Sequence, residues 1–166
     1  MCEVKPHLAV VDYGLSVLEA ACPVEWRAAR RRLCCVALGP RGVALEELRA
    51  LAREAPDRLR YAYVYTHAQP DFVRALANGS GIDISEMEHR IVVIWRREPT
   101  RIQYEWLNET WPTCTSDGYE SAHYQQRLND TKRALDNLIK RLLKPTEMMA
   151  YETHVQVYDV FPFITY

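Results

Sequence analysis

The order of apolar and polar residues along the chain predicts a series of strands and helices. The first clear strand is the continuous apolar run 33–38, closed by Gly39-Pro40-Arg41-Gly42, which is typical of a parallel strand buried on both faces. A second strand is predicted over 61–66, which is rich in aromatic and β-branched residues. Segment 89–95 predicts a third strand, and the strict alternation of 101–106 predicts a fourth, antiparallel to the third and with one buried face.

Helical periodicity predicts four helices around these strands. An amphipathic stretch from about 15 to 21 precedes the first strand, and 43–55 follows it with leucines at helical spacing. A short helix is expected to begin at Pro70 and to stop at Asn78-Gly79. The last helix is long and follows a capping box at 117–120. Its packing stripe is predicted to consist of Tyr124, Leu128, Thr131, Leu135, Leu138 and Leu142.

This order of elements predicts the fold. From residue 33 onward it is strand, helix, strand, helix, strand, strand, helix, and two right-handed parallel units joined to an antiparallel hairpin form the thioredoxin arrangement. We therefore predict an α/β, thioredoxin-like domain with a mixed four- to five-stranded sheet and helices on both faces. The domain is expected to span 1–145. The remaining segment, 146–166, is an apolar C-terminal tail that either covers the domain's own surface or marks a partner or membrane-proximal contact.

Composition and charge exclude several classes of function. Twenty-one basic and 22 acidic residues give a net charge of −1, so no global field attracts nucleic acid. The longest apolar runs, such as 91–95, are far shorter than the roughly 20 residues of a membrane helix, so a soluble chain without a transmembrane segment is expected. No cofactor is predicted, because no phosphate-binding or catalytic motif is present. No metal site is predicted either, because ligand-pair spacing is absent around His7, His67, His89, His123 and His154.

Three of the four asparagines stand in N-x-S/T sequons, which are N-glycosylation acceptors in secretory compartments. They are Asn78, Asn108 and Asn129. Asn129 falls off the packing stripe of its helix, so it is expected to be accessible. Coincidence in a cytosolic protein is the alternative. Because 1–6 lacks a signal-peptide pattern, a lumenal domain would here be a fragment of a longer protein.

The loop at 39–42 lies where a thioredoxin carries its catalytic pair of cysteines, at a helix N-terminus that lowers the thiol pKa. This loop contains no thiol. Segment 85–89, before the third strand, also lacks the proline that redox members place beside the active site. Thioredoxin-type redox chemistry is therefore not predicted, although weak anion binding at 39–42 stays open.

The five cysteines form no C-x-x-C pair. Cys34 and Cys35 are neighbours on a strand, so their side chains point to opposite faces. Cys22 could reach Cys34 as a structural disulfide, and buried free thiols are the equal alternative; Cys2 and Cys114 are unassigned. An alternative function is that of a thiol-dependent thioredoxin-superfamily enzyme using Cys34 or Cys35, against which their position within a strand argues.

A basic segment precedes the first strand and contains Arg27, Arg30, Arg31 and Arg32. A solvated loop that guards against aggregation is favoured over a docking patch for an acidic partner. A third hypothesis for function is an oligomerisation domain that uses the aromatic tail.

Particular residues resemble a known family. They are Leu18-Glu19-Ala20-Ala21-Cys22-Pro23-Val24, the strand 33–38, and Arg60-Tyr61-Ala62-Tyr63-Val64-Tyr65-Thr66 with Gln69, Phe72 and Leu76. Over roughly 8–110 the chain resembles a lumenal thioredoxin-like segment of the DnaJ homolog subfamily C member sixteen co-chaperones. Members of that family are membrane-anchored proteins of the endoplasmic reticulum with an N-terminal J domain, which recruits an Hsp70, and several thioredoxin-like domains. They have been associated with autophagosome formation.

The resemblance implies a non-catalytic, redox-inactive domain of a lumenal co-chaperone that binds or positions proteins, in agreement with the sequons. The His-Pro-Asp motif of a J domain is absent from this chain, as is a transmembrane helix. By itself the chain is therefore not expected to stimulate an Hsp70 ATPase or to span a bilayer. An Hsp70 partner would be reached through a J domain outside this chain.

Overall fold

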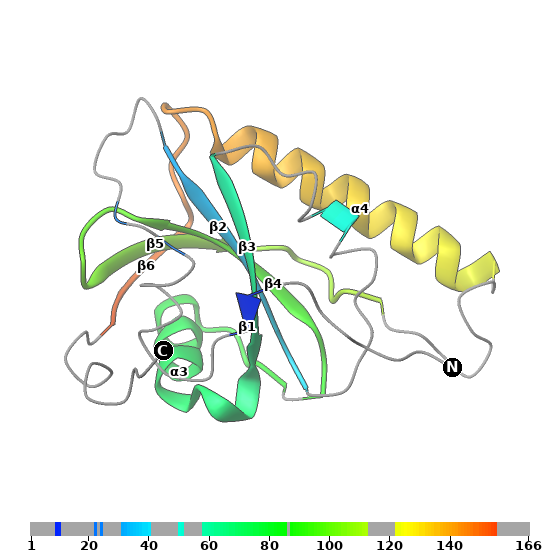
Figure 1. Cartoon of the computed structure of the whole chain (residues 1–166), viewed down its shortest axis with the longest axis horizontal. Helices are drawn as coiled ribbons and strands as arrows, with labels where there is room; N and C mark the ends of the chain where they lie inside the picture. Colours follow the sequence, from blue (N-terminus) through cyan, green and yellow to red (C-terminus); the bar gives the residue numbers. More distant parts are fainter. Residues whose placement is uncertain are drawn as a thin grey trace.

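The computed structural model describes residues 9–10, 22, 24, 31–40, 50–51, 58–85, 87–112 and 122–155. Their core is a mixed six-stranded sheet with the order β1-β3-β2-β4-β5-β6 (Figure 1). The strands are β1 (Ala9–Val10), β2 (Leu33–Gly39), β3 (Leu59–Tyr65), β4 (Arg90–Arg96), β5 (Arg101–Trp106) and β6 (Tyr151–His154). The helices are α3 (Pro70–Ser80), α4 (Ala122–Leu142) and the short 3₁₀ helix η2 (Thr66–Ala68).

Strand β2 lies at the centre of this sheet, as its apolar run predicts. It pairs in parallel with β3, from Leu33 opposite Leu59 to Gly39 opposite Tyr65. On its other side it pairs antiparallel with β4, and all seven of its residues are buried. A strand with neighbours on both edges and helices over both faces has no solvated side, which explains the absence of alternation in its sequence. The predicted thioredoxin-like arrangement is confirmed.

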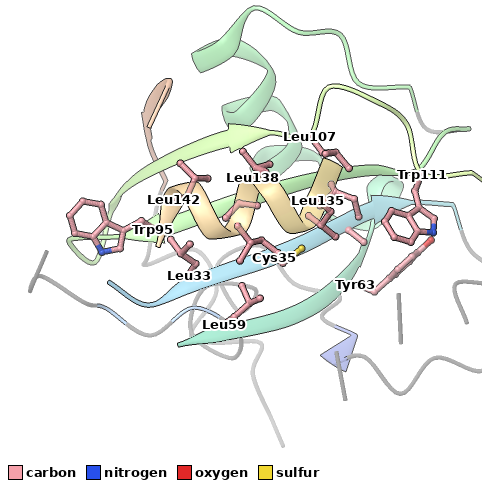
Figure 2. Packing of buried hydrophobic residues seen from close by; sticks show 14 of the residues in the cluster. Leu33, Cys35, Leu59, Tyr63, Trp95, Leu107, Trp111, Leu135, Leu138 and Leu142 are labelled. Carbon is pink, nitrogen blue, oxygen red and sulfur yellow. The ribbon is translucent and has the colours of Figure 1, made fainter. Parts of the chain in front are cut away.

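Helices α3 and α4 lie on opposite faces of the sheet (Figure 1), and the alternation of β2 divides the core between them. Leu33 and Cys35 point toward α4 and its leucines (Figure 2). Cys34 and Val36 point to the other face, where Phe72 of α3 packs. The predicted stripe of α4 is buried in full, so the periodicity of 3.6 identified its packing face correctly.

The predicted stop of α3 at Asn78-Gly79 is wrong, because the helix continues to Ser80. It ends at Gly81, which has a left-handed backbone with φ of 72° and donates its N–H to the carbonyl four residues earlier. Gly79 instead allows close packing, since a Cβ at this position would overlap the hydroxyl of Tyr104 and lie 3.1 Å from Cβ of Thr153.

The sheet has six strands against the predicted four to five, and two of them, β1 and β6, are not among the four strands predicted by residue range. Strand β6 pairs antiparallel with β5, from Tyr151 opposite Tyr104 to His154 opposite Arg101, and it lies inside the segment predicted as a tail. This part of 146–166 therefore extends the domain's own sheet, while 156–166 lie outside the described residues. The domain boundary after residue 145 stays a prediction.

Other predicted features lie outside the described residues. These are the helices at 15–21 and 43–55, apart from the helical pair Ala50-Leu51, and the capping box at 117–120. No helix in the described part of the chain is long and apolar enough to cross a membrane.

Arg31 belongs to the basic segment, for which a solvated loop or a docking patch is predicted. Neither description fits Arg31, because it is buried, with 3% of its surface exposed. Its Nη1 donates to the carbonyl of Leu142 at 2.9 Å and its Nη2 to that of Glu147 at 2.8 Å, while its guanidinium lies 4.4 Å from the ring centre of Trp95. Burial lowers the pKa of Arg31, and Glu147 opposes that shift. Arg31 is buried because it donates hydrogen bonds at the end of α4, where the last carbonyls have no partner within the helix.

Arg58 completes this contact from the start of β3. Its Nη2 donates to the carbonyl of Leu143 at 3.0 Å and its Nε to that of Arg31 at 3.1 Å. Two cations therefore sit at the negative end of the α4 dipole. We call Arg31, Arg58 and the carbonyls that they bind the arginine clasp. It fixes the C-terminal end of α4 against the beginnings of β2 and β3.

Candidate functional site

The candidate site lies where the carboxyl ends of β2 and β3 meet the beginning of β4. Residues 39–42 occupy the position at which a thioredoxin carries its catalytic cysteines. Of these residues, Gly39 and Pro40 are described and Arg41 and Gly42 are not. His89 directly precedes β4. The described residues contain no cis peptide bond, so the peptide before His89 is trans.

A chain of hydrogen bonds crosses this end of the sheet. The hydroxyl of Tyr63 lies 2.6 Å from the carbonyl oxygen of Pro40 and 2.9 Å from Nε2 of His89. A phenol has one proton to donate, and the carbonyl can only accept. Tyr63 therefore donates to Pro40, and His89 donates from Nε2 to Tyr63. His89 therefore carries a proton on Nε2.

Burial fixes the protonation of both side chains. His89 is 1% exposed, and burial lowers its pKa from 6.5 to about 4. Its Nδ1 has no hydrogen-bond partner among the described residues. Burial, and after it the neighbouring Tyr65, raises the pKa of Tyr63. Neither group exchanges a proton near neutral pH, so the pair acts as a packed polar plug and is poorly suited to acid–base chemistry.

Gly39 is the residue on which this plug packs. A Cβ at position 39 would overlap the imidazole of His89, lying 2.6 Å from Nε2, and would lie 2.9 Å from the hydroxyl of Tyr63. Both neighbours are buried and hydrogen-bonded. Gly39, Tyr63, Pro40 and His89 therefore pack together beside the position at which a thioredoxin carries its catalytic thiols; we call them the Tyr-His plug.

We expect Gly39→Ala to lower the free energy of unfolding by about 1–3 kcal/mol, because a methyl group has no space beside the imidazole. Urea unfolding followed by circular dichroism measures the change. The double variant Gly39→Ala/His89→Ala removes the opposing ring. Its loss of unfolding free energy should therefore be smaller than the sum of the losses caused by the two single changes. Additive effects would contradict the contact.

The two cysteines of β2 lie on opposite faces of the sheet. Cys35 is a free thiol that is 1% exposed under α4, and burial raises its pKa. On the opposite face, Cys34 is bonded to Cys22, with Cα atoms 5.5 Å apart. Arg96, itself buried, donates from Nη1 to the carbonyl of Cys22 at 3.2 Å. Neither cysteine of β2 is placed as an accessible nucleophile.

Comparison with known proteins agrees with this fold. The family model described as DJC16, thioredoxin-like domain 3, matches residues 15–150. The chain belongs to this family. The resemblance to the DnaJ subfamily C member sixteen co-chaperones is thereby confirmed, and the match extends through α4 to residue 150, beyond the predicted limit near residue 110. No curated protein and no solved structure gives a significant match.

The three sequon asparagines of the DJC16 domain are all exposed. Asn78 lies in α3, Asn108 follows β5 after one residue, and Asn129 lies in α4. The three asparagines belong to different elements of the fold, so each is surrounded by different residues. Among the described residues, no three His, Cys, Asp or Glu side chains form a group that could hold a metal ion.

A concave site of the DJC16 domain lies beside the last residues of β5, between α4 and the beginning of β6. Its volume is about 480 Å³. Glu105 on its floor pairs with Arg141 of α4 and accepts a hydrogen bond from the N–H of Ala150 at 3.3 Å. Asn108 and Tyr151 also line it. We call it the β5–α4 groove.

The sequence shows that 39–42 contain no cysteine, but it does not predict the Tyr-His plug. Two signals were available: a histidine placed directly before a buried strand, and a glycine at the last position of another. They could be joined only by knowing that β2, β3 and β4 are adjacent and in which register.

Proposed function

We propose that this DJC16 domain is a non-catalytic module that binds or positions proteins in the lumen of the endoplasmic reticulum, as part of a membrane-anchored J-domain co-chaperone. The observation that carries the proposal is the Tyr-His plug. It places two buried, hydrogen-bonded side chains at the end of the sheet at which thioredoxins work, and it contains no thiol and no group that titrates near neutral pH.

The surroundings of Cys35 support the same conclusion. A nucleophilic cysteine needs an accessible thiolate with a lowered pKa. Cys35 is buried and its pKa is raised, so the competing proposal of a thiol-dependent enzyme has no accessible thiolate in β2. The oligomerisation hypothesis depends on the aromatic tail, of which 156–166 lie outside the described residues.

We expect Cys35 of the native domain to react with a thiol reagent at least about 100-fold more slowly than in guanidinium chloride, because reaction requires unfolding. A Cys2→Ser/Cys114→Ser background isolates this thiol, and mass spectrometry of the alkylated peptides measures the rate. Cys35→Val supplies the blank. Rapid alkylation at pH 7, or reduction of insulin above the buffer rate, would refute the non-catalytic role.

The compartment is supported by three exposed sequons and by the family resemblance. Expression of the chain behind a signal peptide should give a mass shift that endoglycosidase H removes. The asparagine-to-glutamine variants of the three sequons identify the occupied sites. A chain without any glycan would remove the lumenal location. An Hsp70 partner would be engaged through a J domain outside this chain, so the isolated domain should leave Hsp70 ATPase activity unchanged.

A further inference from the structure

We propose that the β5–α4 groove seats the first sugar of a glycan attached to Asn108, so that this glycan is a packed part of the domain. The inference rests on the proposed lumenal function, because only a lumenal chain receives an N-linked glycan. It goes further by assigning a chemical occupant to the groove and a structural role to one sequon.

The first step is placement. Asn108 is exposed, follows β5 after one residue, and is itself part of the lining of the groove. A sugar on its side-chain nitrogen therefore begins at the groove and needs no long linker to reach it. Because the sugar is tethered, its effective concentration at the groove is high, and weak contacts are enough to hold it there.

The second step is chemical fit. A pyranose ring has an apolar face of C–H groups and a rim of hydroxyl and amide groups. The groove offers Tyr151, which is half-buried and contributes an aromatic ring, together with the apolar side chains of Leu107 and Leu138. It also offers the Glu105–Arg141 ion pair and the exposed residue Glu109, whose carboxylate accepts a hydrogen bond from Thr131 at 3.4 Å. The combination of apolar walls and a few polar groups is typical of a small-ligand site.

The third step is the contrast with Asn129, which has the same N-x-T form of sequon. Asn129 lies on the exposed face of α4, where Gln126 donates to Asp130 at 3.0 Å and Arg133 pairs with Asp130 at 3.9 Å. These are solvated helix neighbours, and Asn129 is not part of the groove lining. It supplies a matched control within the same chain.

The test uses the whole chain expressed behind a signal peptide, with only Asn108 or only Asn129 left as an acceptor. Endoglycosidase H leaves one N-acetylglucosamine on each occupied asparagine. We expect this single sugar at Asn108 to raise Tm by about 2–4 °C over the Asn108→Gln chain. The sugar at Asn129 should leave Tm unchanged. The N-acetyl methyl proton of the Asn108 sugar should also show an upfield ring-current shift in the NMR spectrum.

Two groove variants show whether the gain comes from the groove. Tyr151→Ala removes the aromatic wall, and Ala134→Gln fills the groove from α4 with a residue that favours helix. In both, the difference in Tm made by the sugar at Asn108 should fall by at least half. Since the comparison is made within each background, a loss of stability by the variant itself does not affect it.

The remaining outcomes separate this inference from the proposed function. A glycan on Asn108 whose effect on Tm is absent, or is insensitive to Tyr151 and Ala134, overturns the inference and leaves the lumenal function intact. A chain that carries a glycan on Asn129 but none on Asn108 also overturns the inference and leaves the lumenal function intact. If no sequon is occupied, both the inference and the lumenal location fail.

Discussion

Replacing Arg31 with alanine is expected to lower the free energy of unfolding by about 3–5 kcal/mol, which is a large part of the stability of an ordinary domain. The change leaves the carbonyls of Leu142 and Glu147 without their charged donor. It also removes the guanidinium that lies over Trp95. Urea unfolding at pH 7, followed by circular dichroism, measures the difference.

Matched variants separate the contributions of this side chain. Arg31→Met keeps an apolar stem over Trp95 but donates no hydrogen bond, so it should recover only a small part of the loss. Arg31→Lys keeps the charge but lacks the planar fork that reaches two carbonyls at once, so it should also fall short. Arg60→Ala, at an exposed arginine of β3, should stay within about 0.5 kcal/mol of the wild type. Equal effects of Arg31→Ala and Arg60→Ala would contradict the arginine clasp.

Acid is expected to weaken the domain through His89. Its folded pKa is about 4 against an ordinary 6.5, so between these values the unfolded chain binds a proton that the folded chain does not. The stabilisation is therefore complete above pH 6.5 and is lost as the pH falls toward 4. The loss attributable to His89 is about 3 kcal/mol over this window.

The variant His89→Gln tests this assignment. Glutamine can still donate a hydrogen bond to Tyr63 but does not titrate, so its stability should depend less steeply on pH between 6.5 and 4. Urea unfolding of both proteins at pH 7.5, 6, 5 and 4.5 gives the two slopes. Carboxylates elsewhere contribute equally to both proteins and cancel in the comparison. Parallel slopes would show that His89 is not held neutral by burial.

Much of this fold could be predicted from the sequence, because its strongest patterns are local. The apolar run of β2, the alternation of β5 and the stripe of α4 each identify an element and its buried face. Strand β6 could not be predicted in this way. It has four residues and is nowhere fully buried, so the only local signal was an apolar surplus over 146–166, which a tail explains equally well.

For the candidate site, too, local features could be predicted from the sequence and long-range contacts could not. Its location follows from element order, and the missing thiol follows from reading 39–42. Its content depends on contacts between residues far apart in the chain, such as Tyr63 and His89, which are 26 positions apart. The same holds for Arg31, which binds a carbonyl 111 positions away. A run of arginines carries no sign of which member will be buried, because that depends on where a distant helix ends.

The Tyr-His plug also bears on how a domain of this kind could change its chemistry over time. A side chain at position 39 meets the imidazole of His89 and the hydroxyl of Tyr63 together. A first mutation there lowers stability before any new activity exists to compensate for it. Acquisition of an exposed reactive group at position 39 therefore requires several substitutions, with the buried ring of His89 removed before or along with the change at Gly39. Packing therefore makes an exposed reactive group at this position hard to acquire by single substitutions.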